Sequence, residues 1–154
     1  MDPTDLSGLD ASSARDYVTQ FMVTLRTTRG ELTKLGEERA KWEGRIKLAV
    51  EGGRDDLMAS AREHLADVQR RVGVLAAEEQ EQAAQLSILR DQLRRLQQRF
   101  DPTIDTEQLL AQLEAAVGER DELADQFKEL QKTEESERAL QELKERMRQP
   151  DEER

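Results

Sequence analysis

Apolar residues recur at alternating spacings of three and four along two long stretches of the chain, about residues 12–51 and 55–100. This heptad spacing gives a helix one apolar stripe and is typical of coiled coils. The pattern therefore predicts two long helices, the first capped by Ser12 or Ser13. The first stripe is Ala14, Val18, Phe21, Leu25, Leu32, Leu35, Trp42, Ile46 and Ala49, and the second is Leu57, Ala61, Leu65, Val68, Val72, Leu75, Leu86, Leu89, Leu93, Leu96 and Phe100.

Two adjacent glycines, Gly52 and Gly53, separate the two stretches. A glycine inside a helix costs about 1 kcal/mol relative to alanine, and it readily adopts the left-handed conformation that ends a helix. Asp55 and Asp56 follow, where negative charge favours a helix amino terminus. Two long stripes joined by so short a link predict an antiparallel helical hairpin.

The polar positions that interrupt the stripes support this hairpin. Pairing about the glycines matches residues whose numbers add to roughly 105. It places Trp42 near Leu65 and Thr28 near Glu79. Thr28 and Arg39 are the polar positions in the first stripe, and Glu79 and Gln82 interrupt the second. The pairing of Thr28 with Glu79 should bring the polar interruptions of both helices together at one level of the hairpin.

Shorter helices are expected after the hairpin, which Asp101-Pro102 should end because proline disfavours helix at the preceding residue. A third helix is predicted at about 106–132, then a break at Thr133-Glu134-Glu135-Ser136 and a fourth helix at about 137–148. The predicted fold is all-α, organised as a flexible acidic amino end (1–10), a coiled-coil hairpin (11–100), and shorter helices with an acidic tail (101–154).

Composition narrows the functional classes. Charged residues make up 38% of the chain, aromatic residues make up 3%, and the net charge is -10. Residues 101–154 hold seventeen acidic residues against eight basic ones, which argues against nucleic acid as the main partner. The chain has no cysteine, no signal-peptide pattern at its amino end and no apolar run of the roughly 18 residues that a membrane span needs. These features predict a soluble, cytoplasmic protein.

Candidate catalytic and metal sites are few. His64 is the only histidine, and we expect it to face water. The segment Gly52-Gly53-Arg54-Asp55-Asp56 lacks the Lys-Ser/Thr pair of a phosphate-binding loop. Two slim helices offer the many carboxylates no water-excluding pocket. We therefore expect no enzyme activity, no cofactor, no metal and no small-molecule substrate.

Four arginines form a basic patch near the end of the second helix: Arg90, Arg94, Arg95 and Arg99, opposed there only by Asp91. One interpretation is a solvated face that complements the negative carboxyl end of the helix. The other is a dock for the acidic tail or for an anionic lipid surface. Trp42, the single tryptophan, is interpreted as a stripe residue rather than as a ligand platform.

Two blocks of sequence resemble the phage-shock protein A family, which includes the vesicle-inducing protein of plastids. The first is Trp42, then Leu48-Ala49-Val50, then Arg54-Asp55-Asp56-Leu57, similar to the tip of that family's hairpin. The second, residues 123–147, resembles the family's carboxyl-terminal region: an Asp-Gln-Phe block, a Glu-Leu, a polar break and a Leu-x-x-Leu-Lys-x-x-Met helix.

This resemblance implies an ESCRT-III-like fold and polymerisation at a membrane. Members of the family maintain membrane integrity under stress, and some inhibit a transcriptional activator of the AAA+ type. In the assembled family the last helix crosses a neighbour's hairpin. Family members usually begin with an amphipathic helix, whereas this chain begins MDPTDLSGLD, and the segment between hairpin and final helices is shorter than usual. We therefore expect a short member, without that helix, whose contact with anionic membranes is weak or indirect.

The resulting expectation is a homo-oligomer acting in membrane maintenance or stress response, peripheral at the inner face of the cell membrane. The alternative is a soluble coiled-coil adaptor or regulatory binder that holds a partner protein, such as an AAA+ ATPase. The tail is expected to dock on an outer face of a hairpin, its own or a neighbour's. The candidate tip residues are Trp42, Leu48, Ala49, Gly52, Gly53, Arg54, Asp56 and Leu57, and the candidate tail residues are Leu123, Asp125, Gln126, Phe127, Leu130, Leu140, Leu143 and Met147.

Overall fold

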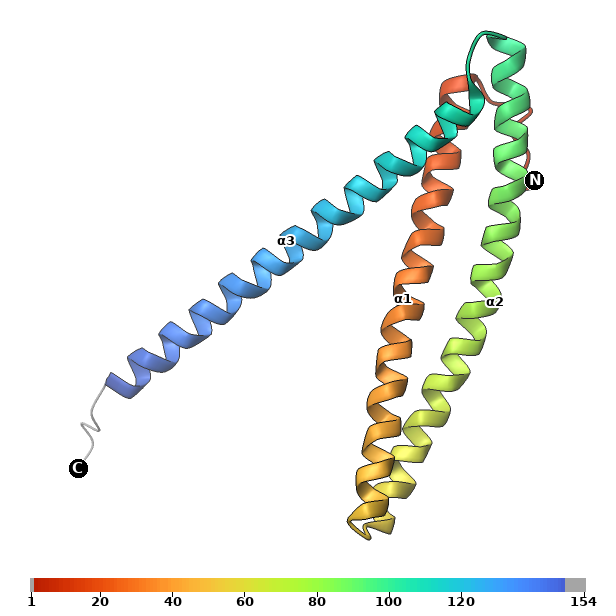
Figure 1. Cartoon of the computed structure of the whole chain (residues 1–154). Helices are drawn as coiled ribbons and strands as arrows, with labels where there is room; N and C mark the ends of the chain where they lie inside the picture. Colours follow the sequence, from red (N-terminus) through yellow and green to blue (C-terminus); the bar gives the residue numbers. More distant parts are fainter. Residues whose placement is uncertain (1, 149–154) are drawn as a thin grey trace. The chain divides into compact units, whose positions relative to one another are not determined.

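The computed structural model describes residues 2–148 and is all-α, as the sequence predicts. Three helices follow one another: α1 (Ala11–Glu51), α2 (Asp55–Phe100) and α3 (Thr106–Arg148). Figure 1 shows α1 and α2 side by side, joined by a tight turn. The chain divides into two compact units, Met1–Ala111 and Gln112–Arg154. The first holds the hairpin and the first turns of α3, and the second holds the rest of α3.

The helix α1 begins one residue before the predicted caps. Asp10 is the cap, and its carboxylate accepts a hydrogen bond of 2.8 Å from the backbone N–H of Ser13. The Ser13 hydroxyl donates to the same carboxylate at 3.0 Å. The serine prediction is therefore corrected: Ser13 is a donor to the cap, because a carboxylate at this position satisfies an otherwise unpaired N–H.

The predicted glycine turn is present. The N–H of Gly52 donates to the carbonyl of Leu48 at 2.9 Å, and Gly53 has a φ of 63°, in the left-handed region that glycine adopts at little cost. The N–H of Arg54 donates to the carbonyl of Ala49 at 2.9 Å and closes the turn. Asp55 begins α2 at once, so only three residues separate two helices of more than forty residues each.

The hairpin core is one seam of side chains between α1 and α2. Met22 is buried where the pattern predicted Phe21, whose side chain is only partly covered, and Leu57 and Phe100 at the two ends of the second stripe are exposed. Most of the other predicted stripe positions are buried or half-buried. The buried residues are Ala14, Val18, Met22, Leu25, Thr28, Leu35 and Ala49 of α1 and Ala61, Val68, Gln82, Leu86, Leu89, Leu93 and Gln97 of α2.

The polar interruptions meet at one level, with a small shift in pairing. The Thr28 hydroxyl donates to Oε1 of Gln82 at 2.9 Å, and Glu79 pairs with Arg29 at 2.7 Å. The prediction placed Thr28 opposite Glu79, three residues from its observed partner. A buried threonine and a buried glutamine each need a hydrogen-bond partner inside a seam, and here their side chains bond to each other.

The amino end is packed, which corrects the expectation of a flexible segment. Leu6 is 1% exposed, and its backbone N–H donates to Oε1 of Gln92 at 2.8 Å. The Tyr17 hydroxyl donates to the carbonyl of Pro3 at 2.7 Å. One leucine with two polar anchors therefore holds residues 2–10 against the far end of the hairpin from the turn.

The helix α3 is a single helix of 43 residues, so the predicted break at 133–136 and the separate fourth helix are wrong. The segment contains neither glycine nor proline, and glutamate is a good helix former. The Thr133 hydroxyl donates to the carbonyl of Glu129 at 2.9 Å, a bond that threonine makes inside helices. The third helix is therefore as long as the first two. The predicted acidic tail beyond residue 148 lies outside the described residues.

Candidate functional site

The hairpin tip carries an aromatic stack that the sequence pattern did not predict. The rings of Trp42 and His64 lie with their centroids 4.3 Å apart and are inclined by 9°. The guanidinium carbon of Arg45 lies 4.3 Å from the centre of the Trp42 ring, which is cation–π distance. The predicted partner, Leu65, is the next residue after His64. The hairpin register, rather than any local motif, brings this exposed histidine to the tryptophan.

Beside this stack lies an apolar groove of about 330 Å³. Leu48 is 68% exposed and Leu57 is 51% exposed, so two of the predicted tip residues present apolar surface to solvent. The predicted tip residues Trp42, Leu48, Ala49, Arg54 and Leu57 line the groove together with Arg45, Ser60 and Ala61.

The predicted tip residue Asp56 forms an ion pair with Arg54 at 3.1 Å. The hydrogen bond from the Arg54 side chain, followed by one from the backbone at Leu57, lowers the pKa of Asp56 below its usual value. Both side chains are more than half exposed, so the pair contributes little to the stability of the hairpin.

The candidate tail residues are all exposed within the described chain. Phe127 is 69% exposed and Met147 is 80% exposed. The other large apolar side chains, Leu123, Leu130, Leu140 and Leu143, are between 53% and 58% exposed, and Asp125 and Gln126 are exposed as well. The structure therefore brings none of these residues to a docking surface, and the predicted docking stays a prediction.

Because α3 is continuous, its six exposed large apolar residues form two separate faces. At about 100° per residue, Leu123, Phe127 and Leu130 share one side of the helix. We call them the upper face. Leu140, Leu143 and Met147, the lower face, point about 130° away around the same axis. One straight partner helix cannot cover both faces.

The basic patch is partly neutralised. Arg94 forms ion pairs with Asp91 at 2.8 Å and with Glu107 in the first turn of α3. Arg90 is half-buried, whereas Arg95 and Arg99 are exposed. Glu107 precedes the predicted tail, so this ion pair does not test the expected docking of the tail on these arginines, which stays a prediction. Two exposed arginines are what the patch offers to another molecule.

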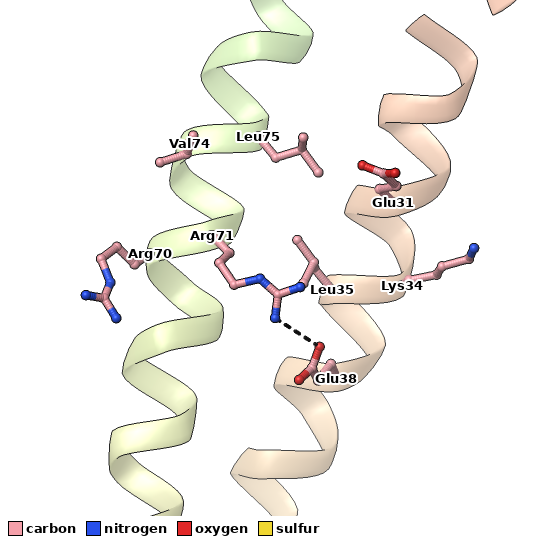
Figure 2. A pocket seen from close by; sticks show the side chains of 8 residues that line it. All are labelled: Glu31, Lys34, Leu35, Glu38, Arg70, Arg71, Val74 and Leu75. Carbon is pink, nitrogen blue, oxygen red and sulfur yellow. Dashed lines mark ion pairs between the residues drawn. The ribbon is translucent and has the colours of Figure 1, made fainter. Parts of the chain in front are cut away.

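A second groove, midway along the hairpin, was missed by the sequence analysis. It has a volume of about 690 Å³ and is lined by Glu31, Lys34, Leu35, Glu38, Arg70, Arg71, Val74 and Leu75. Figure 2 shows Leu35 and Leu75 directed toward the space between the two helices, with Arg71 reaching across to Glu38. The nitrogen and oxygen of that ion pair are 3.8 Å apart. We call these eight residues the middle groove.

The middle groove exists because the seam is thin at this level. Between Leu35 and Ala49, α1 has no buried residue; Arg39 occupies a stripe position and is exposed. On the facing helix Val74 lies outside the stripe and is 68% exposed. Two features of the sequence indicate this groove: the charged residue Arg39 in the first stripe, and the apolar residue Val74 next to the second stripe.

Within residues 2–148 no group of three or more histidine, aspartate or glutamate side chains is arranged to hold a metal ion. None of the helices in that range combines the length and the apolar character needed to cross a membrane. Comparison of the chain with protein-family models, with curated proteins and with solved structures gives no match.

Proposed function

We propose that this protein is a non-enzymatic, self-assembling helical protein of the phage-shock A and ESCRT-III-like type, acting in membrane maintenance or stress response. The observation that carries the proposal is α3, whose last 26 residues expose six large apolar side chains on two faces. Exposed apolar side chains grouped on a helix face are typical of protein interaction surfaces. The seam of the hairpin is already filled by α1 and α2, so another surface must cover them.

The resemblance of the tip and of residues 123–147 supports the same proposal. The tip residues that carry it, Trp42, Leu48 and Leu57, line one groove beside the turn. An apolar groove on one copy and apolar faces on another are different surfaces. Contacts between unlike surfaces generate rings or filaments rather than closed dimers, which is the kind of assembly that the resemblance implies.

Membrane contact, in this proposal, is made by the assembly and not by the amino end. Leu6 is buried on the hairpin and has no apolar surface left for lipid. Of the basic patch, Arg95 and Arg99 are exposed, and each contributes about 1 kcal/mol near an anionic surface. A single copy should therefore bind anionic vesicles weakly, and sodium chloride should release it.

Negative-stain microscopy combined with light scattering tests the proposal. The wild-type chain is compared with Phe127→Ser/Leu130→Ser and with a matched control, Gln131→Ser/Gln141→Ser, whose two exposed positions lie on the same helix outside the candidate tail residues. Polymers in the wild type and the control, and none in the apolar variant, are the expected result. A stable dimer of all three proteins would instead favour the coiled-coil adaptor or regulatory binder.

A further inference from the structure

The lower face of α3 has basic side chains on both of its flanks. At about 100° per residue, Lys144 lies about 70° to one side of the centre of this face, and Arg146 lies about 90° to the other side. Glu142 and Glu145 lie about 130° or more from the centre, on the back of the helix. All four side chains are exposed. The lower face is therefore apolar in the middle, basic at its edges and acidic behind.

The charge along α3 changes sign where its apolar face changes direction. Residues 119–137, which surround the upper face, contain eight acidic and three basic residues. Residues 138–148, which contain the lower face, hold two acidic and four basic residues. Glu137 lies immediately before this basic segment, so the basic character belongs to the last three turns of the helix. The two faces are therefore suited to surfaces of different charge.

The order of side chains around the lower face is typical of a helix that lies in the surface of a bilayer. Such a helix buries its apolar side chains at the boundary between headgroups and acyl chains. The long stems of flanking lysine and arginine cover apolar surface while their charged ends reach the lipid phosphates. The lower face belongs to a continuous helix of 43 residues, so binding does not require a short segment to fold first.

We propose that the lower face of α3 binds the surface of an anionic lipid bilayer. The inference rests on the proposed role in membrane maintenance and assigns the lipid contact to particular residues. The apolar side chains of the lower face enter the bilayer surface, and Lys144 and Arg146 contact lipid phosphates. One copy offers only three large apolar side chains, all more than half exposed. Binding is therefore weak for a single copy and strong for an assembly that presents many lower faces at once.

Co-flotation of the full chain with vesicles tests the apolar part of this contact. Vesicles of phosphatidylglycerol and phosphatidylcholine in equal parts are compared with vesicles of phosphatidylcholine alone. Leu140→Ser/Leu143→Ser should lower the partition constant on the anionic vesicles by roughly tenfold or more, because two apolar side chains no longer leave water. The control Gln131→Ser/Gln141→Ser, at two exposed positions outside both faces, should leave the partition constant unchanged.

Two variants with the same loss of charge test the orientation of the helix. Arg146→Gln removes a charge beside the lower face, whereas Arg138→Gln removes one about 170° away from its centre. Screening limits such attraction to about 8 Å at physiological salt, so Arg146→Gln should weaken binding severalfold more than Arg138→Gln. Equal losses would overturn the orientation. Asp151→Asn/Glu152→Gln removes acidic groups that follow the helix in the sequence and should strengthen binding, and unchanged or weaker binding would contradict the electrostatic part of the proposal.

A fluorescent label identifies what covers the lower face, since the chain has no cysteine of its own. A nitrobenzoxadiazole group attached to Leu143→Cys should brighten severalfold when anionic vesicles are added. The same group attached to Gln141→Cys, about 130° from the centre of the face, should not brighten. Brightening of the Leu143→Cys label in assemblies without lipid would show another copy on this face and would overturn the proposal.

Light scattering without vesicles separates this inference from the proposed function. Leu140→Ser/Leu143→Ser should assemble as the wild type does, because the self-assembly test concerns the upper face. If the wild type and this variant float equally well with anionic vesicles, the assignment to the lower face is overturned and the membrane role stands. If the wild type does not float even at low salt, the membrane role falls, and this inference falls with it.

Discussion

The buried pair of Thr28 and Gln82 should behave as one unit in the stability of the hairpin. Thr28 is 6% exposed and Gln82 is 9% exposed, and their side chains are joined at 2.9 Å. The amide nitrogen of Gln82 is held separately by Glu78 at 3.0 Å. Replacing Thr28 by valine keeps the volume and removes the hydrogen bond to Oε1 of Gln82.

The cost of that substitution follows from the acceptor that is left behind. A buried polar group without a partner costs about 1–3 kcal/mol, so Thr28→Val should destabilise the chain by that amount. Gln82→Leu removes a hydrogen bond that contributes roughly 1 kcal/mol to stability. The buried leucine side chain offsets part of that loss through the hydrophobic effect. The double variant replaces both partners by apolar groups and should lie close to the wild type.

Urea unfolding followed by circular dichroism at 222 nm measures this cycle, at a protein concentration where light scattering finds no assembly. The expected coupling between the two substitutions is on the order of 1 kcal/mol or more. Purely additive effects, or a Thr28→Val variant as stable as the wild type, would refute the reasoning that this layer is a bonded pair.

Three further predictions concern other parts of the hairpin. Gly36→Ala and Gly44→Ala should each raise stability by roughly 0.5–1 kcal/mol, because an added Cβ at either position meets no atom within 4 Å. Gly53→Ala should lower stability, because Gly53 has a φ of 63°. Thermal melts in which Gly53→Ala is as stable as the other two variants would contradict the left-handed turn. Trp42→Ala should cost about 1–3 kcal/mol, less than the ~3–5 kcal/mol of a fully buried tryptophan, because Trp42 is half-buried; urea unfolding of this variant and of His64→Ala shows whether the stack contributes. The hydrogen bonds from the backbone and hydroxyl of Ser13 lower the pKa of Asp10, so the stability that this cap contributes is complete above the unfolded-state pKa and is lost as pH falls through the folded-state pKa. The protection of the Ser13 amide against hydrogen exchange, taken relative to the intrinsic exchange rate at each pH, should therefore fall on acidification in the wild type. Asp10→Ala should abolish this pH dependence.

The hairpin could be predicted because its determinants are periodic and local. Two heptad stripes interrupted by Gly52-Gly53 leave few alternatives to a turn. The exact pairing was less accessible. The numbers of contacting residues add to 106 at Trp42 and His64 but to 110 at Thr28 and Gln82, whereas a constant sum was assumed. A symmetric model of the turn cannot anticipate that drift, since it depends on how two long helices supercoil.

Other misses have different causes. Leu6 is one of two leucines in the acidic segment 1–10, and no apolar period there indicates that it packs beside Gln92, 86 residues away in the sequence. The polar run at 133–136 resembled a break, but polarity without glycine or proline does not end a helix. The middle groove lies where α1 has no buried residue between Leu35 and Ala49, and a list of apolar stripe residues does not reveal such a gap. The upper and lower faces could not be predicted, because their directions depend on the continuity of α3, whereas a break at 133–136 was expected.

Self-assembly through α3 is tested most directly by the mass of the particle in solution. Size-exclusion chromatography with multi-angle light scattering is run over a range of concentrations on the full chain and on a chain that ends at Ala111, the last residue of the first compact unit. We expect the full chain to grow well beyond its own mass of 17.7 kDa as concentration rises, while the shortened chain stays helical and does not grow. A full chain that stays monomeric throughout, or a shortened chain that assembles equally well, would contradict the role given to α3.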